Sequence, residues 1–201
     1  MMKKFAVAML AGLMMLSFQF TQSKNKRVYA ETLDQVEIYT VQKGDTLFDI
    51  GLKKGVSELE LRNINHIKSN KPHSGQKLIL PKTISKAEKE LLARLVHAEA
   101  KGEPYKGKVA VALVVLNRVE DHRFPDNIKD VIYQKRQFQP VDNGSINDAA
   151  DHDSKKAVME ALALEGQDND SVYFFNPDKT NSKWLRSRTV TTVIGNHRFA
   201  K

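Results

Sequence analysis

The chain has 201 residues, of which 41% are hydrophobic and 28% are charged, a composition typical of folded globular proteins. It contains no cysteine, which excludes a disulfide framework, a thiolate metal site and a cysteine nucleophile. Five of the basic residues fall in residues 1–30, which hold no acidic residue, so only about +3 of the net charge of +8 belongs to the rest of the chain. A nucleic-acid-binding protein is therefore not expected.

Residues 1–30 have the features of a secretory signal peptide. Lys3 and Lys4 precede an uncharged run from Phe5 to Phe20, shorter than the roughly 20 apolar residues that a membrane-spanning helix needs. Val28-Tyr29-Ala30 supplies small residues for a cut after position 30. We expect an exported protein, and the alternative is an uncleaved leader that holds the chain in a membrane.

The chain beyond this leader divides at Pro81, where the apolar period changes from strand-like to helical. The predicted organisation is a lead-in at 31–38, a first domain at 39–81, a linker at 82–88 and a second domain at 89–201. At about 50 residues or fewer, the first domain must be compact to be stable alone.

The first domain begins with a predicted strand at 37–41, followed by a turn that runs through Gly44 and Asp45 into a helix N-cap at Thr46. Apolar spacing predicts two short helices, the first ended by Gly55 and the second capped by Ser57. A last strand is expected at 77–80. The predicted order is strand, helix, helix, strand.

These segments resemble a LysM domain over residues 39–81. The resemblance is carried by Tyr39-Thr40-Val41-Gln42-Lys43-Gly44-Asp45-Thr46-Leu47, Gly55-Val56-Ser57, Asn63 and Gly75-Gln76-Lys77-Leu78-Ile79-Leu80-Pro81. LysM modules hold chains that contain N-acetylglucosamine, so the resemblance implies binding of peptidoglycan glycan strands, with Gly44, Asp45 and Thr46 near the sugar groove. The alternative is that turn formation and helix capping alone account for Asp45 and Thr46.

A carboxylate lies on the apolar stripe of the next predicted helix. Ser85 and Glu88 form a capping box, and Glu99 follows Leu95 by four residues, where the pattern asks for an apolar side chain. Gly102 and the following Pro104 place Glu99 near the C-terminal end, where the helix dipole disfavours negative charge. Burial and the dipole both raise the pKa, as a general acid requires. The alternative is that Glu99 reaches water at the edge of the stripe.

The same helix begins a second resemblance, to the SleB/CwlJ family of cell wall hydrolases, over roughly residues 90–200. It is carried by Ala93-Arg94-Leu95-Val96-His97-Ala98-Glu99-Ala100-Lys101-Gly102-Glu103-Pro104-Tyr105, Leu116-Asn117-Arg118-Val119, Gln137-Phe138-Gln139-Pro140-Val141, Tyr173-Phe174-Phe175-Asn176-Pro177, Ser182-Lys183-Trp184 and Ile194-Gly195-Asn196-His197-Arg198-Phe199. The resemblance implies a spore-cortex-lytic enzyme, acting in sporulation or germination as a lytic transglycosylase, with Glu99 as catalytic acid. It also implies a secreted protein associated with the cell wall or spore cortex.

The expected fold class is α+β: a small βααβ LysM domain, then a lysozyme-like, mainly helical catalytic domain with a small β-sheet. Predicted helices cover 109–116, 128–134 and 155–164, and predicted strands cover 171–175 and 189–194. Gln137 and Phe138 begin a polar and aromatic loop at 137–145 that we expect to line a cleft. Tyr173 and Trp184 are further candidates for stacking on sugars, although such aromatic residues more often belong to a core.

Other acidic residues allow a second catalytic carboxylate, and the sequence leaves a hydrolytic pair open. Glu103 precedes a proline, which favours a role in orienting the loop. His97-Ala98-Glu99 lacks the cysteines of a zinc deaminase, and Asp148, Asp151 and Asp153 lack the spacing of a calcium loop and are better explained as a helix start. We expect no metal, no cofactor and a monomer. The alternative function is a catalytically inactive protein that binds the wall or tethers a partner.

Overall fold

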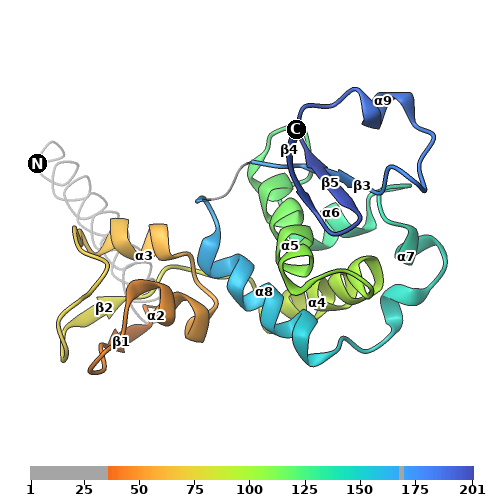
Figure 1. Ribbon diagram of the computed structural model, residues 1–201. Coiled ribbons are helices and arrows are strands. Elements are labelled where there is room, and N and C mark those ends of the chain that lie inside the picture. Colours follow the sequence, from red (N-terminus) through yellow and green to blue (C-terminus); the bar gives the residue numbers. More distant parts are fainter. Residues whose placement is uncertain (1–35, 168–169) are drawn as a thin grey trace, which may run out of the picture. The chain divides into compact units, whose positions relative to one another are not determined.

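The computed structural model describes residues 36–167 and 170–201, so the predicted signal peptide lies outside the described residues (Figure 1). Among the helices of the described part of the chain, none has the length and apolar character needed to cross a membrane.

The first domain has the predicted βααβ order. β1 (Ile38–Thr40) and β2 (Lys77–Ile79) form a two-stranded sheet, and α2 (Leu47–Lys54) and α3 (Glu58–Ile64) lie between them in sequence. Its caps are those expected, as Thr46 forms a capping box with Asp49, Gly55 ends α2 in the left-handed conformation and Ser57 caps α3. Its core consists of buried aliphatic side chains: Val41, Leu47, Ile50, Leu61, Leu78 and Leu80.

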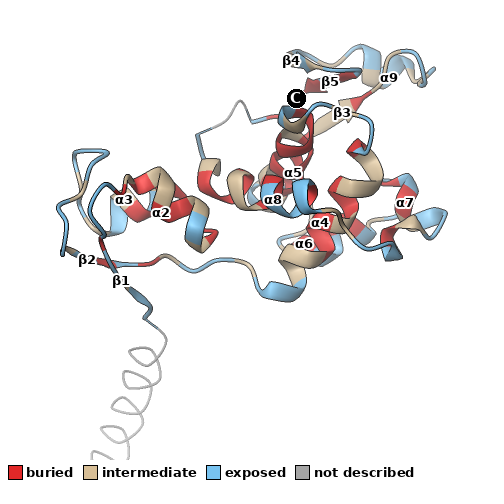
Figure 2. Ribbon diagram, turned by 60° about the horizontal axis from the view of Figure 1, so that its bottom comes forward, coloured by how far each residue is buried: buried red, intermediate tan, exposed pale blue. Residues whose placement is uncertain are grey.

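The second domain is mainly helical and is built around one buried helix. That helix is α5 (Tyr105–Glu120), which packs against α4, α6, α8 and β3 and is buried along most of its length (Figure 2). The other elements are α4 (Lys86–Ala100), α6 (Ile128–Tyr133), α7 (Gln139–Asp142), the 3-10 helix η1 (Ser145–Asn147), α8 (His152–Leu164), β3 (Tyr173–Phe175), α9 (Lys183–Arg186), β4 (Val190–Ile194) and β5 (His197–Ala200).

The three strands form an antiparallel sheet in the order β3-β5-β4, with β5 in the centre. Tyr173 pairs with Ala200, and Ile194 pairs with His197 beside the turn that joins β4 to β5. Phe199 on β5 is almost completely buried and belongs to the helical core, so the central strand fixes the sheet to the helices.

The segment expected to be a loop at 137–145 contains α7 and the first residue of η1, and both helices pack against α4. Pro140 lies in the first turn of α7, where a missing N–H costs no hydrogen bond. α8 begins at His152 and not at Lys155, because Asp151 caps it by accepting a hydrogen bond from the Ser154 N–H. α4 begins at Lys86, inside the predicted linker, with Ser85 as its N-cap and Glu88 completing the expected capping box.

Candidate active site

Glu99 lies in the last turn of α4, one residue before the helix ends at Ala100. Its side chain is half-buried, and the residues at the other stripe positions, Leu92 and Leu95, are fully buried. The carboxyl group makes no hydrogen bond or ion pair with any described residue, so no neighbour offsets its loss of hydration. This burial raises the pKa of Glu99 from its usual 4.5 to about 7.

The neighbouring carboxylate, Glu103, has a different environment. Its Oε2 accepts a hydrogen bond from the Asn196 N–H at 2.9 Å, and its Oε1 accepts one from Asn196 Nδ2 at 3.1 Å. Partial burial raises the pKa of Glu103, but these two hydrogen bonds, with the nearby His197 and Lys179, outweigh that effect and leave it below the usual value. Glu103 therefore connects the loop after α4 to the β4–β5 turn, which agrees with the expected role of Glu103 in orienting that loop.

Asp151, the N-cap of α8, contacts side chains of α4 and α5. Its Oδ2 lies 3.0 Å from Lys108 Nζ on α5 and 3.2 Å from His97 Nδ1 on α4, and its Oδ1 caps α8 at Ser154. The His97 contact is within ion-pair distance but lacks hydrogen-bond geometry. The hydrogen bonds with Ser154 have the largest effect on the pKa of Asp151, and Lys108 has a smaller one. Together they hold this pKa well below its usual range, although partial burial opposes the shift. The predicted helix start is thus confirmed at Asp151.

Within residues 36–167 and 170–201, no group of three or more His, Asp or Glu side chains is placed to hold a metal ion.

The LysM residues proposed to bind sugar take part in a local network. Asp45 is buried and accepts hydrogen bonds from the Tyr39 hydroxyl at 2.7 Å, the Gln42 N–H at 2.9 Å and Lys53 Nζ at 2.6 Å. These three hydrogen bonds lower the pKa of Asp45 to about 2, and the one from Lys53 has the largest effect. Thr46 exchanges hydrogen bonds with Asp49. These contacts favour turn formation and capping for both residues, while Gly44 is exposed at a φ of 93°.

Gln137, Phe138 and Tyr173 each contact Arg118, a residue that was not predicted as part of the site, and Trp184 contacts Tyr173. Phe138 is only 2% exposed and stacks on Phe174, which favours a core role for its ring. Trp184, in contrast, is 51% exposed and meets Tyr173 edge-on with ring centroids 5.0 Å apart. The sequence signals for Arg118 were its place in the Leu116-Asn117-Arg118-Val119 motif and a cation that follows the apolar run of α5 after one intervening residue.

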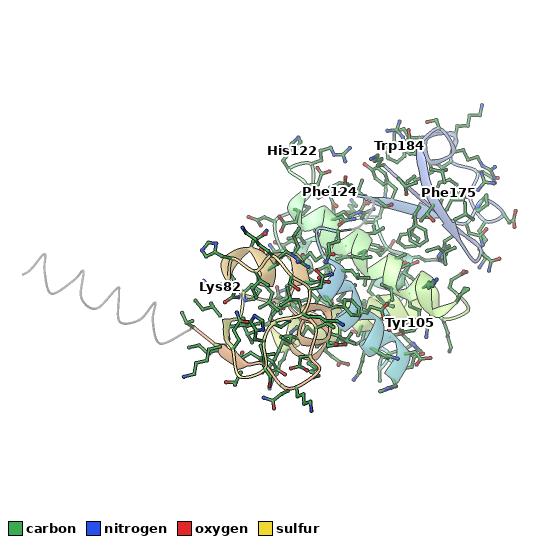
Figure 3. The ribbon with its side chains drawn as sticks, turned by 60° about the vertical axis from the view of Figure 1, so that its left-hand side comes forward. Lys82, Tyr105, His122, Phe124, Phe175 and Trp184 are labelled. Atoms are coloured by element: carbon green, nitrogen blue, oxygen red, sulfur yellow. The ribbon has the colours of Figure 1, made fainter. Side chains whose placement is uncertain are left out.

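These residues lie away from the Glu99 end of the domain. Tyr105, which starts α5 just after the Glu99–Glu103 segment, lies well apart from Phe124 and Trp184 (Figure 3). With a rise of about 1.5 Å per residue, the axial distance along α5 from Tyr105 to Arg118 is about 20 Å. The sequence-predicted site residues of this domain therefore fall into two groups, the acid at one end of α5 and the aromatic residues near the other.

Two family models match the chain. The Cell Wall Hydrolase model matches residues 102–200, and the LysM domain model matches residues 39–81. The first match begins three residues after Glu99.

Solved structures match the second domain. The catalytic domain of the germination-specific lytic transglycosylase SleB from Bacillus anthracis is 38% identical with a TM-score of 0.56, and the match covers 60% of this chain and 99% of that one. The SleB catalytic domain of Bacillus cereus is 39% identical with the same TM-score, and the match covers 60% and 94% of the two chains. The expected α+β fold class is confirmed by these matches.

Curated relatives are spore cortex-lytic enzymes. The one from Bacillus cereus is 39% identical over 132 residues, which are 66% of this chain and 51% of the relative. The one from Bacillus subtilis is 35% identical over 122 residues, which are 61% of this chain and 40% of the relative. The chain thus spans about half the length, or less, of these relatives. From the matched domains and the SleB catalytic structures, the chain belongs to the SleB-type cell wall hydrolase family and carries a LysM domain ahead of its hydrolase domain.

Proposed function

We propose that the protein cleaves peptidoglycan at the glycosidic bond between N-acetylmuramic acid and N-acetylglucosamine, as a lytic transglycosylase with Glu99 as the proton donor. The observation that carries this proposal is the half-buried carboxyl of Glu99, whose pKa of about 7 keeps much of it protonated near neutral pH. Family membership and the relatives' names support the same chemistry.

In the proposed reaction, Glu99 gives its proton to the glycosidic oxygen as the bond from that oxygen to C1 of N-acetylmuramic acid breaks. The C6 hydroxyl of the same sugar attacks C1, and its proton returns to the Glu99 carboxylate. The products are an anhydro sugar end and a free hydroxyl on the leaving sugar. No second carboxylate is needed, which agrees with the engagement of Glu103 by Asn196.

The proposed setting is the bacterial cell wall or spore cortex. The LysM domain holds the enzyme on glycan strands, and residues 1–30 direct export before they are removed. The proposed organisation keeps 31–38 as lead-in, 39–81 as LysM domain, 82–88 as linker and 89–201 as hydrolase domain, acting as a monomer. Cortex lysis at germination is the proposed role, as in the relatives' names.

The decisive experiment incubates the purified protein with isolated spore cortex and vegetative sacculi, and analyses the released fragments by mass spectrometry. We expect fragments with an anhydro end, about one water lighter than hydrolysed ends, because the C6 hydroxyl and not water attacks C1. Glu99→Gln keeps the shape of the side chain without its acidic proton, and should reduce cleavage by at least about a hundredfold.

The same experiment separates this proposal from a catalytically inactive wall-binding protein. Co-sedimentation with sacculi measures wall binding, which Glu99→Gln should leave intact. A wild-type protein that binds sacculi but releases no fragments supports the inactive alternative. Fragments with only hydrolysed ends would keep the glycosidase and exclude the transglycosylase.

A further inference from the structure

A buried arginine in the hydrolase domain has no acidic partner. Arg118, near the end of α5, is only 4% exposed. Its Nε donates to the Val172 carbonyl at 2.7 Å, and its Nη1 donates to Gln137 Oε1 at 3.2 Å. Both acceptors are neutral, and no carboxylate in the described ranges pairs with Arg118. Buried charges in proteins are normally paired, so this cation lacks its usual partner.

Aromatic rings surround the guanidinium but supply no negative charge. Its central carbon lies 4.9 Å from the ring centroid of Phe124, 5.1 Å from that of Phe138 and 5.7 Å from that of Tyr173. Such contacts stabilise a cation without neutralising it. Burial still lowers the pKa of Arg118, to about 10. The folded domain therefore has a charged site that an anion would stabilise.

The cluster opens toward the surface at Gln137 and Trp184. The side chain of Gln137 is exposed, and its Nε2 donates to no described residue. Tyr173 is half-buried, and its hydroxyl likewise has no partner among the described residues. Both groups are polar and contact or flank Arg118, and the Tyr173 ring also contacts the exposed ring of Trp184.

A second guanidinium reinforces the positive charge of the same surface. Arg188 lies 4.6 Å from the Trp184 ring centroid, and its buried Nε has no hydrogen-bond partner. Arg123 beside Phe124 differs, because Asp121 holds it with contacts of 2.9, 3.1 and 2.6 Å. Among the described residues, Arg118 and Arg188 thus have no carboxylate partner of the kind that Arg123 has.

We propose that Arg118, Gln137, Tyr173 and Trp184 form a subsite that binds a carboxylate of a peptide stem while Trp184 stacks on a neighbouring sugar. Arg118 supplies a charge-assisted hydrogen bond, the Gln137 amide a second donor and the Tyr173 hydroxyl a third. The inference rests on the proposed function, since it assigns a substrate group to the same glycan-cleaving enzyme. It adds a preference for stem peptides with free carboxylates over the same stem peptides with amidated carboxylates.

The subsite acts on binding and not on the bond-breaking step, because it lies about 20 Å along α5 from the Glu99 end of the domain. Amidation of the stem carboxylates should therefore raise KM by about tenfold, the loss expected for one charge-assisted hydrogen bond, and leave kcat nearly unchanged.

Binding can be measured without cleavage in the Glu99→Gln variant. Trp184 is the single tryptophan of the chain, so intrinsic fluorescence reports directly on this subsite. The two probes are a muropeptide tetrasaccharide with free stem carboxylates and the same compound with those carboxylates amidated, each also titrated by calorimetry. We expect the carboxylated probe to bind about tenfold more tightly and to change Trp184 fluorescence.

A variant that supplies a carboxylate to Arg118 from the protein itself tests the subsite without removing the buried arginine. Gln137→Glu places a carboxylate against Arg118, which should raise the thermal unfolding temperature and remove the preference for the carboxylated probe. Gln139→Glu is the matched control, because Gln139 is also exposed, lies two residues away and is not a hydrogen-bond partner of Arg118. This control should keep the preference.

Equal affinity for the two probes, or no binding of either, overturns the subsite, as does a preference that survives in Gln137→Glu. The outcome is independent of the proposed cleavage reaction. A wild-type protein that releases no fragments but binds carboxylated probes preferentially contradicts only the enzymatic proposal. A protein that cleaves but does not discriminate between the probes contradicts only the subsite.

Discussion

The pKa of Glu99 sets the pH range in which it can donate a proton. Burial raises that pKa to about 7, so the carboxyl is mostly protonated below this value and mostly ionised above it. We expect kcat/KM to fall by about tenfold for each pH unit above about 7, because only the protonated form is active. Initial rates on a soluble muropeptide between about pH 5 and about pH 9 test this expectation. A profile that stays flat through neutrality would remove Glu99 from the proton-transfer step.

The same ionisation affects folding. Because the pKa of Glu99 is higher in the folded than in the unfolded chain, its contribution to stability is complete below about pH 4.5 and is lost as the pH rises through about 7. The Glu99→Gln variant has no such group, so it should gain stability relative to wild type between about pH 5 and about pH 9, by on the order of 3 kcal/mol. Urea unfolding at the two pH values measures the difference. A gap between the two proteins that does not change with pH would show that Glu99 is well hydrated.

Residue-level prediction from the sequence succeeded where the determining contacts are local. The position of Glu99 on an apolar stripe follows from helical spacing, and the partners of Asp45 and Thr46 lie within eight residues of them in the chain. Arg118 was missed, because its partners Gln137 and Val172 are 19 and 54 residues away. No local pattern in the sequence shows that such an arginine lacks a carboxylate.

At the level of elements, the contact between the α4–α5 loop and the β4–β5 turn leaves no room for a side chain at Gly195. Gly195 has a φ of 57°, and a Cβ atom built on it would lie 2.1 Å from Glu103 Oε2 and 2.7 Å from Pro104 Cδ. Gly195→Ala should therefore lower the free energy of unfolding by at least about 2 kcal/mol, through backbone strain and displacement of Glu103. Urea denaturation followed by circular dichroism gives the change.

Gly102→Ala is the control, because Gly102 lies in the same loop as Glu103, has an ordinary φ and has no atom within 4 Å of an added Cβ. It should be close to neutral in stability. If Gly195→Ala is as well tolerated as Gly102→Ala, the Glu103–Asn196 contact does not hold the turn against the loop.

Elements defined by their own caps and period were predicted, and elements defined by distant partners were not. The capping boxes at Thr46 and Ser85 and the glycine stop at Gly55 lie next to the helices they delimit. The β5 strand was not predicted, because its strand character comes from pairing with β3 and β4 on either side. The short α7 helix lies in the segment 137–145, whose polar composition indicated a loop, and η1 begins at the end of that segment; both helices pack against α4.

At the level of the whole molecule, the LysM domain and the hydrolase domain have separate hydrophobic cores. The LysM core lies within residues 39–80 and the hydrolase core within residues 84–199, and no residue belongs to both. The SleB catalytic domain of Bacillus anthracis was solved as a domain alone, and this chain covers 99% of it. A hydrolase domain without LysM is therefore expected to fold.

A protein that begins at Lys82 should keep the catalytic chemistry and lose its anchorage. On soluble muropeptides its kcat/KM should equal that of a chain that begins at Glu31, because the proposed proton donor and the proposed subsite both lie in the hydrolase domain. On insoluble sacculi its rate should fall by about tenfold or more, since a tethered catalytic domain meets glycan strands at a higher effective concentration than a free one. Co-sedimentation with sacculi, measured beside both rates, separates anchorage from chemistry. Equal co-sedimentation of the two proteins would show that the hydrolase domain itself holds the wall, and a loss of rate on the soluble substrate would show that LysM contributes to the catalytic site.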